Sequence, residues 1–181
     1  MNYFKIIPIF IFTSLCYSQS EVNYYNIIDS VSELRIENDI KKLVSFGTTH
    51  TLSDTLSNSN GIGAARRWIK KSFTEISKNC DNCLEVSYQK NYFKKNKRRL
   101  VKDVWINNVI AIQRGKTNPN RFIIMSGDID SRVSDSNDFK SLSPGANDNA
   151  SGMAGVIEAA SVVVGSLKSK LNMTQKELEQ I

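Results

Sequence analysis

The sequence predicts a three-layer α/β fold, in which helices cover both faces of a mixed, mainly parallel sheet. One observation behind this prediction is a continuous apolar run at 122–125, which stops before Gly127. Such a run is typical of a central parallel strand that is buried on both faces. The other is a later segment in which apolar residues recur at helical spacing, which predicts a helix with one buried face. These residues are Met153, Val156, Ile157, Ala160 and Val164.

Three helices are expected, two of them before the first strand. The first covers about 32–46 and ends at Gly47, because glycine is the common residue just past a helix. The second covers about 60–78, and Asn60 is placed to cap its first turn. The third covers about 149–166. The apolar stripes of the first two helices are Ile36, Ile40, Leu43 and Val44, and Ile62, Ala65, Ile69, Phe73 and Ile76.

Three strands are expected between the second and third helices, at about 84–93, 103–113 and 121–127. In the first strand, apolar and polar residues alternate from Leu84 to Tyr88. This alternation is typical of an edge strand with one face in water. The third strand contains the apolar run and is expected at the centre of the sheet.

The first 18 residues are expected to be a signal peptide. Their apolar core at 6–15 is too short to span a bilayer, which favours a removable signal over a membrane anchor. Lipid attachment at Cys16 is less favoured, because the bulky Leu15 precedes it. The protein is therefore expected to be secreted or periplasmic, with no stable membrane anchor. Residues 19–181 then form one partial domain, in which 166–181 is an atypical, lysine-rich tail.

The chain is basic, with a net charge of +6, and much of that charge lies between residues 90 and 102. Tyr92 and Phe93 interleave with these lysines and arginines, which raises the possibility of nucleic-acid binding. A short charge run between two strands is more often the solvated tip of a hairpin. We therefore predict a solvated tip and no nucleic-acid partner.

Cys80 and Cys83 form a Cys-x-x-Cys pair that could hold zinc, act in redox chemistry or form a disulfide. A zinc site needs further ligands, and the chain has no second pair of cysteines or histidines. A thioredoxin-like site would lie between a strand and a helix, whereas this pair follows a helix and precedes a strand. An exported protein favours oxidation, so we predict a structural disulfide.

The candidate metal ligands are carboxylates. Asp128 and Asp130 follow the apolar run with one residue between them, so both are expected to face the same way. Asp148 begins the next helix, and open α/β sheets bind ligands at such places. The alternative is that Asp148 only stabilises the start of the helix, where the helix dipole favours a negative charge. The sole histidine, His50, is far from these acids in sequence, and we favour a local hydrogen bond over a ligand role.

Two motifs carry a resemblance to a known family. Gly-Asp-Ile-Asp-Ser at 127–131 and Pro-Gly-Ala-Asn-Asp-Asn-Ala-Ser-Gly at 144–152 resemble those of the secreted bacterial zinc aminopeptidases with two co-catalytic metals. These enzymes are relatives of glutamate carboxypeptidase and glutaminyl cyclase. Weaker matches lie upstream. They are found at 45–48, 52–55, 61–68 and 107–111.

The resemblance implies a role for each acid. Asp148 matches the acid that bridges two zinc ions, and Asp130 matches the acid that orients a zinc-binding histidine. Asp128 stands where the family has that histidine. The family's general base and remaining ligands follow in a Glu-Glu pair, an aspartate and a histidine. In this chain Glu177 and Glu179 are not adjacent, and we interpret them as a solvated face.

The resemblance implies an exported zinc-dependent aminopeptidase that removes N-terminal residues from peptides. The chain resembles only the N-terminal part of that family, so its fold is expected to be incomplete at the C-terminus. Because the later ligands and the base are missing, the chain alone is expected to be inactive. The alternative is a non-catalytic binding or scaffold descendant, which the replacement of a ligand histidine by Asp128 would fit.

Overall fold

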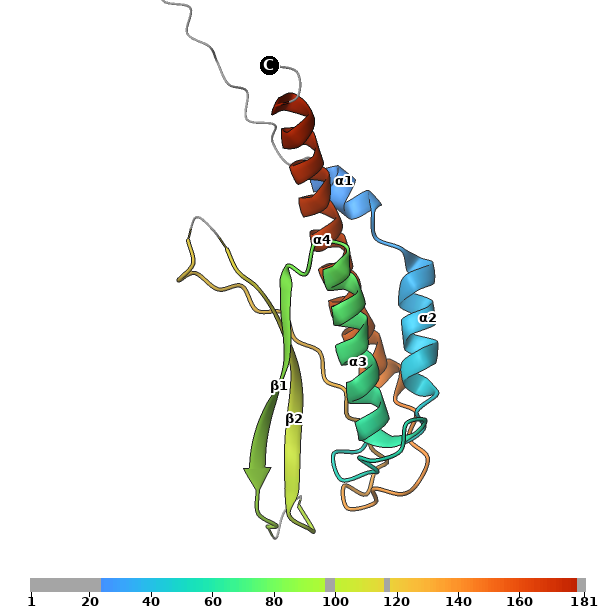
Figure 1. Ribbon diagram of the computed structural model, residues 1–181. Helices are drawn as coiled ribbons and strands as arrows, with labels where there is room; N and C mark the ends of the chain where they lie inside the picture. The colour runs from blue at the N-terminus through green and yellow to red at the C-terminus, as the bar shows by residue number, and fades with distance from the viewer. Residues whose placement is uncertain (1–23, 97–99, 116–117, 179–181) are drawn as a thin grey trace, which may run out of the picture.

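The computed structural model describes residues 24–96, 100–115 and 118–178. The predicted signal peptide at 1–18 and Glu179 lie outside these described residues. Along the chain come three helices, a hairpin of two strands, a short distorted turn of helix and a long final helix (Figure 1). They are α1 (Tyr24–Asp29), α2 (Glu33–Val44), α3 (Gly61–Lys78), β1 (Leu84–Phe93), β2 (Val104–Gln113), η1 (Ala146–Ala150) and α4 (Ser151–Leu178).

The predicted helices at 32–46 and 60–78 are confirmed as α2 and α3. The hydroxyl of Ser32 accepts a hydrogen bond from the backbone of Arg35 at 3.3 Å and so caps α2. The third predicted helix begins at Ser151 and continues beyond residue 166 to Leu178, so most of the predicted tail is helical backbone. Among the described residues, no helix is long and apolar enough to cross a membrane.

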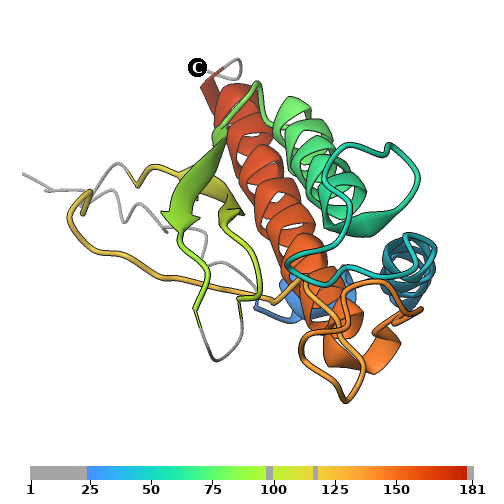
Figure 2. The same cartoon turned by 90° about the horizontal axis from the view of Figure 1, so that it is seen from below.

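The first two predicted strands are confirmed as β1 and β2, which pair antiparallel with Tyr88 opposite Val109. The hairpin lies on one side of the helices, and α3 packs against both strands (Figures 1 and 2). The described part of the tip between the strands is exposed, apart from a half-buried Leu100, which confirms the solvated tip. There the carboxylate of Asp103 accepts hydrogen bonds from the Tyr92 hydroxyl at 2.6 Å and the Lys95 backbone at 2.8 Å.

The prediction of a buried central strand at 121–127 is wrong. This segment has no regular structure, and the side chains of Phe122 and Ile123 are 80% and 92% exposed. Figure 2 shows it as irregular chain running from the hairpin towards the start of α4. A strand needs neighbouring strands to pair its backbone N–H and C=O groups, and none of the strands in the described ranges pairs with it.

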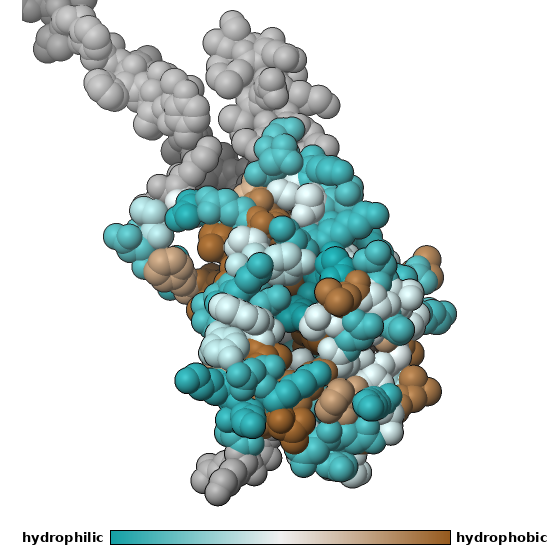
Figure 3. All heavy atoms as spheres, turned by 60° about the horizontal axis from the view of Figure 1, so that its bottom comes forward, coloured by the Kyte–Doolittle hydropathy of each residue, from teal (hydrophilic) through white to brown (hydrophobic). Residues whose placement is uncertain are grey.

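The predicted three-layer arrangement with a mainly parallel sheet is therefore not confirmed. The described residues form helices against a two-stranded antiparallel sheet, which is a mixed α/β structure. The face seen in Figure 3 is mainly hydrophilic, with apolar residues in scattered groups.

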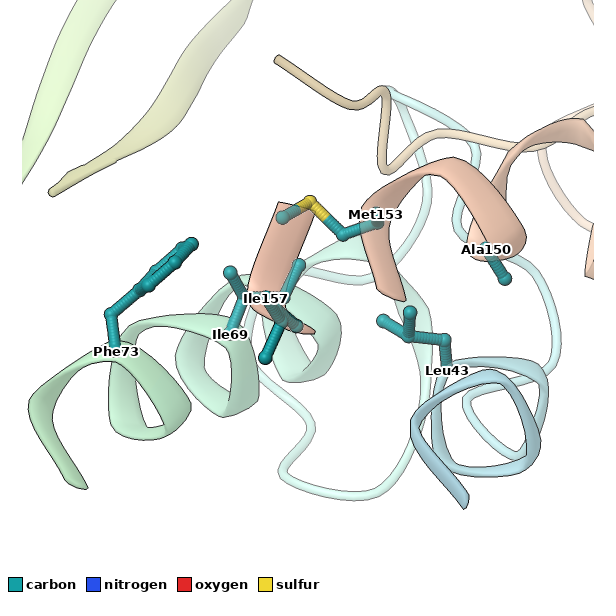
Figure 4. Close-up of a cluster of buried hydrophobic side chains, with 6 residues drawn as sticks. All are labelled: Leu43, Ile69, Phe73, Ala150, Met153 and Ile157. Atoms are coloured by element: carbon teal, nitrogen blue, oxygen red, sulfur yellow. The ribbon is translucent and has the colours of Figure 1, made fainter. Parts of the chain in front are cut away.

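The main hydrophobic core lies where α2, α3 and α4 meet (Figure 4). The predicted stripes of the three helices supply most of it, and the inward-facing residues of the hairpin pack against its edge. Met153 and Ile157 of α4 are each 5% exposed, which matches the predicted buried face of that helix. The buried members are Leu43, Ile69, Phe73, Ala150, Met153 and Ile157.

A buried ion pair joins the start of α2 to the middle of α4. The Arg35 guanidinium donates to both carboxylate oxygens of Glu158, at 2.8 Å from Nε and 2.6 Å from Nη2. The backbone N–H of Ser32 donates to the same carboxylate at 2.7 Å. The side chain of Glu158 is 4% exposed, whereas that of Arg35 is 51% exposed. The hydrogen bond from Arg35 is the main reason that the pKa of Glu158 lies below its usual value.

Cys80 and Cys83 form a disulfide between the end of α3 and the start of β1. The two residues between them, Asp81 and Asn82, have φ angles of 55° and 63°. Aspartate and asparagine enter this left-handed region more readily than other non-glycine residues.

We expect Cys80 and Cys83 to be bonded in exported protein, because oxidising compartments preserve such pairs. Alkylation without reduction, followed by mass spectrometry, should leave both cysteines unmodified. Alkylation at both positions in the folded, exported protein would contradict this expectation.

Candidate functional site

Ser131 ties together three segments that are distant in sequence. Its side chain is buried, and its hydroxyl donates to the carbonyl of Ser143 at 2.5 Å. The same oxygen accepts from the backbone N–H of Thr49 at 3.2 Å and lies 2.9 Å from the Thr49 hydroxyl. A second link in the same place joins the Thr48 hydroxyl and the backbone N–H of Ser143 at 3.1 Å. These bonds hold the acidic segment at 128–131 between the loop after α2 and the turn before α4.

Gly145 brings the two acidic motifs side by side. Its φ is +60°, a conformation that L side chains rarely adopt. A Cβ at this position would lie 2.5 Å from Cβ of Ser131 and 2.7 Å from the carbonyl oxygen of Asp148. Both distances are too short for a side chain, so glycine is required for this close approach. The Asp130–Ser131 segment and Asp148 therefore meet around one turn.

Asp148 is the middle residue of η1, with an exposed side chain and non-helical φ and ψ angles of −124° and 94°. The peptide bond between Asp148 and Asn149 is cis. Asn149, and not Asp148, caps the final helix, because its Oδ1 accepts from the N–H of Gly152 at 3.0 Å. The Asp148 carboxylate has no hydrogen bond or ion pair with a described residue. A capping role therefore does not occupy this carboxylate, and its oxygens are free for a ligand.

Asp128 and Asp130 are exposed on either side of Ile129, which is half-buried and packs against the main core. This alternation is the one that an extended segment imposes on successive side chains. One oxygen of Asp130 accepts from the Thr51 hydroxyl at 3.2 Å. This hydrogen bond joins the acidic segment to the loop that also carries Thr49.

His50 is buried and its two ring nitrogens are both used. Its Nδ1 accepts from the backbone N–H of Leu52 at 3.0 Å, so Nε2 carries the proton and donates to the carbonyl of Ser136 at 3.1 Å. The predicted local hydrogen bond is therefore confirmed. Neither nitrogen is free to bind a metal ion in this arrangement.

The loop at 132–143 carries a further acid, Asp138, whose oxygens are also engaged. They accept from the Ser141 hydroxyl at 2.5 Å, the Ser141 backbone at 2.9 Å and the Lys140 backbone at 3.0 Å. The bonds from Ser141 are the main reason that the pKa of Asp138 falls to about 2. Asp138 therefore stabilises its own loop and is not a candidate ligand.

The described residues do not by themselves fit a zinc ion. No group of three or more His, Cys, Asp or Glu side chains in the described ranges could hold a metal. A catalytic zinc ion needs about three protein ligands, commonly with nitrogen or sulfur among them. The free groups here are the carboxylates of Asp128 and Asp148, and carboxylates alone suit harder cations.

The positioning residues around the acids were not predicted as part of the site. Ser131 belongs to a motif that we identified, but its partners Thr49, Thr51 and Ser143 lie in polar loops. Hydrogen bonds between loops leave no periodic pattern in a sequence. Gly145 follows Pro144, a pair typical of tight turns, and that signal could have indicated the close approach.

Comparison with known proteins shows which proteins the chain resembles. Residues 108–174, which contain all three candidate acids, match the family model described as Peptidase family M28. No solved structure is matched significantly. The chain is also similar to curated fungal proteins, each named "Probable zinc metalloprotease".

The relative from Pyrenophora teres f. teres is 42% identical over 137 residues, which cover 76% of this chain and 28% of the relative. The relative from Leptosphaeria maculans is also 42% identical over 137 residues, covering 76% of this chain and 32% of its own length. The relative from Pyricularia oryzae is 38% identical over 135 residues, covering 75% of this chain and 27% of its own length. The chain thus spans about a third or less of these relatives.

The chain is therefore similar to peptidase family M28 over residues 108–174, and to curated proteins named as zinc metalloproteases over about three quarters of its length.

Proposed function

We propose that the chain is part of an exported zinc-dependent aminopeptidase of family M28. The observation that carries this proposal is the meeting of the Asp130–Ser131 segment and Asp148 around Gly145, within the residues that match the family. The same turn leaves the Asp148 carboxylate without a partner among the described residues. Its substrates are peptides with a free N-terminus.

Each acid has a role in this proposal. Asp148 would serve as a metal ligand, Asp128 would offer a further oxygen ligand, and Asp130 would orient a neighbouring group. Zinc, when bound in a complete site, polarises the peptide carbonyl and makes hydroxide available near neutral pH. The described residues of this chain supply carboxylates and the bonds that position them. We expect a polypeptide of these 181 residues alone not to hydrolyse peptides, because no group of three or more ligand side chains lies in the described ranges.

A chimera tests the proposal. The 137 aligned residues of the Pyrenophora teres relative are replaced by the matching residues of this chain. The substrates are an aminoacyl anilide with a free α-amine and the same anilide with an acetylated amine. We expect hydrolysis of the free amine alone, loss of that activity with a chelator, and its return with zinc.

The unaltered relative is the control for the chimera. If the relative hydrolyses the substrate and the folded chimera does not, this chain is a non-catalytic descendant of the family. Equal hydrolysis of the acetylated substrate would contradict the aminopeptidase assignment while leaving the peptidase assignment intact.

A further inference from the structure

A pocket of about 570 Å³ lies between α3, the loop at 51–55 and the hairpin. This volume falls in the range typical of small-molecule sites. Its polar lining comes from both strands as well as from the helix and the loop. The residues that matter here are Thr51, Arg66, Tyr88, Lys90, Lys102 and Asn107.

Arg66 is buried in the wall of this pocket without a matching acid. The residue is 6% exposed, and it has no hydrogen bond or ion pair within the described ranges. Burial is the main reason that the pKa of its guanidinium lies below the usual value. Arg35, by contrast, is half-exposed and yet binds both oxygens of Glu158. The side-chain nitrogens of Arg66 are not among the buried atoms without a partner, so they face the open pocket, where an anion could pair with them.

The carboxylate that lines the pocket does not serve as the partner of Arg66. Asp103 is exposed, and its two oxygens accept from the Tyr92 hydroxyl and the Lys95 backbone N–H. The neighbouring Arg67 is also engaged, since its guanidinium donates to the carbonyl of Thr55 at 2.9 Å. Arg66 is thus the guanidinium of this wall that is left for a ligand.

The rest of the lining favours an anion. Lys90 and Lys102 add two cations, and Lys102 is held with its ammonium 4.3 Å from the ring centre of Phe139. The cationic side chains of the lining outnumber its one carboxylate, Asp103, and a concave site with a net positive charge concentrates anions. Asn107 also lines the pocket, and its buried Oδ1 has no hydrogen-bond partner among the described residues. Arg66 and Asn107 are thus two polar groups of one pocket that have no hydrogen-bond partner among the described residues.

We propose that this pocket binds a small ligand through an oxyanion, either a carboxylate or a phosphate, held by Arg66. A planar guanidinium binds both groups through two parallel hydrogen bonds. A hydroxyl or N–H group on the ligand would satisfy Asn107. Thr51 lines the pocket, and its hydroxyl also donates a hydrogen bond to Asp130. A bound ligand would therefore be separated from the acidic segment at 128–131 only by the side chain of Thr51. The proposal holds whether or not the protein is a peptidase.

The test is a titration of the isotopically labelled protein with acetate and, separately, with inorganic phosphate, at constant ionic strength kept by chloride. We expect saturable shifts of the Arg66 Nε–Hε resonance and of the backbone amides of Thr51 and Asn107. Saturation by one anion and not the other identifies the ligand group. No saturable shift with either anion would overturn the proposal.

Variants assign the binding to Arg66. Arg66→Met should weaken binding by about 10-fold or more, the loss expected for a charge-assisted bond, without lowering the unfolding midpoint. Lys71→Met removes one charge from an exposed position of the same helix and should leave affinity within about twofold. Unchanged affinity in a folded Arg66→Met protein would refute the assignment. If Arg66→Met does not fold, Lys90→Met is the second test of the binding site. Unchanged anion affinity in Lys90→Met would then contradict binding in this pocket.

Discussion

Replacement of Asp148 by Ala in the chimera should reduce zinc-dependent hydrolysis to the rate measured without zinc. Asp148 is the acid whose carboxylate is free and whose position the Gly145 turn determines. If Asp148 is a metal ligand, its loss would weaken metal binding and with it the zinc-dependent activity. Asp130→Asn should cost less, about 10- to 100-fold, because a residue that orients a ligand is less critical than the ligand itself.

Asp135→Asn is the matched control for both variants. Asp135 lies in the same exposed loop region and accepts from the backbone of Asn137 at 2.9 Å, a bond that asparagine can also accept. We expect the control to keep its zinc content and its rate. Loss of activity in Asp148→Ala with full zinc content would contradict a ligand role and would indicate an effect on substrate.

Replacement of Arg35 by Met should lower the free energy of unfolding by about 2–3 kcal/mol, less than the roughly 3–5 kcal/mol for breaking a fully buried ion pair, because Arg35 is half-exposed. The reason is that Glu158 stays buried when its guanidinium partner is removed. Glu158→Met should cost less, about 1 kcal/mol, because the half-exposed Arg35 can then turn to water. Urea denaturation of the two variants measures both values.

Lys41→Met provides the control, since the Lys41–Glu37 pair is exposed at both ends and such surface pairs contribute little to stability. The effect of Arg35→Met should also depend on pH. The pKa of Glu158 is lowered in the folded protein, so its stabilisation is present above the unfolded pKa of about 4.3 and is lost as the pH falls through the folded value. The difference in free energy of unfolding between wild type and Arg35→Met should therefore become smaller at acidic pH.

Asp39 affects the pH dependence of stability in the opposite direction from Glu158. Burial is the main reason that the pKa of Asp39 is raised, so its protonation in acid relieves a cost of the folded state. Equal destabilisation by Arg35→Met and Lys41→Met, or a gap that widens in acid, would contradict the role given to the buried pair.

Much of the fold could be predicted because helices and hairpins leave local patterns. The stripes that contain Leu43, Ile69 and Met153 do form the core, and the alternation from Leu84 to Tyr88 does form a strand. The segment at 122–125 shows the limit of such patterns. An apolar run indicates that a segment can be buried, but strand structure also requires partners for its backbone, which the described residues do not give it.

The site could be predicted in part for a similar reason. The motifs identified Asp130 and Asp148 by their spacing, and the structure brings their segments together. The buried bonds of Ser131 join residues about 82 positions apart, which no local pattern reveals. Arg66 resembles a surface residue in sequence, because it lies beside the apolar stripe of α3 and next to another arginine. Its burial depends on how the hairpin packs over the helix.

The most direct test is made on the chain itself. Residues 24–181 are expressed, titrated with zinc and assayed with an aminoacyl anilide beside an Asp148→Ala control. Because the described residues offer carboxylates but no group of three ligands, we predict no tight zinc binding and no zinc-dependent turnover above the control. Stoichiometric zinc binding with turnover that disappears in Asp148→Ala would contradict this account, since the chain alone would then complete the site.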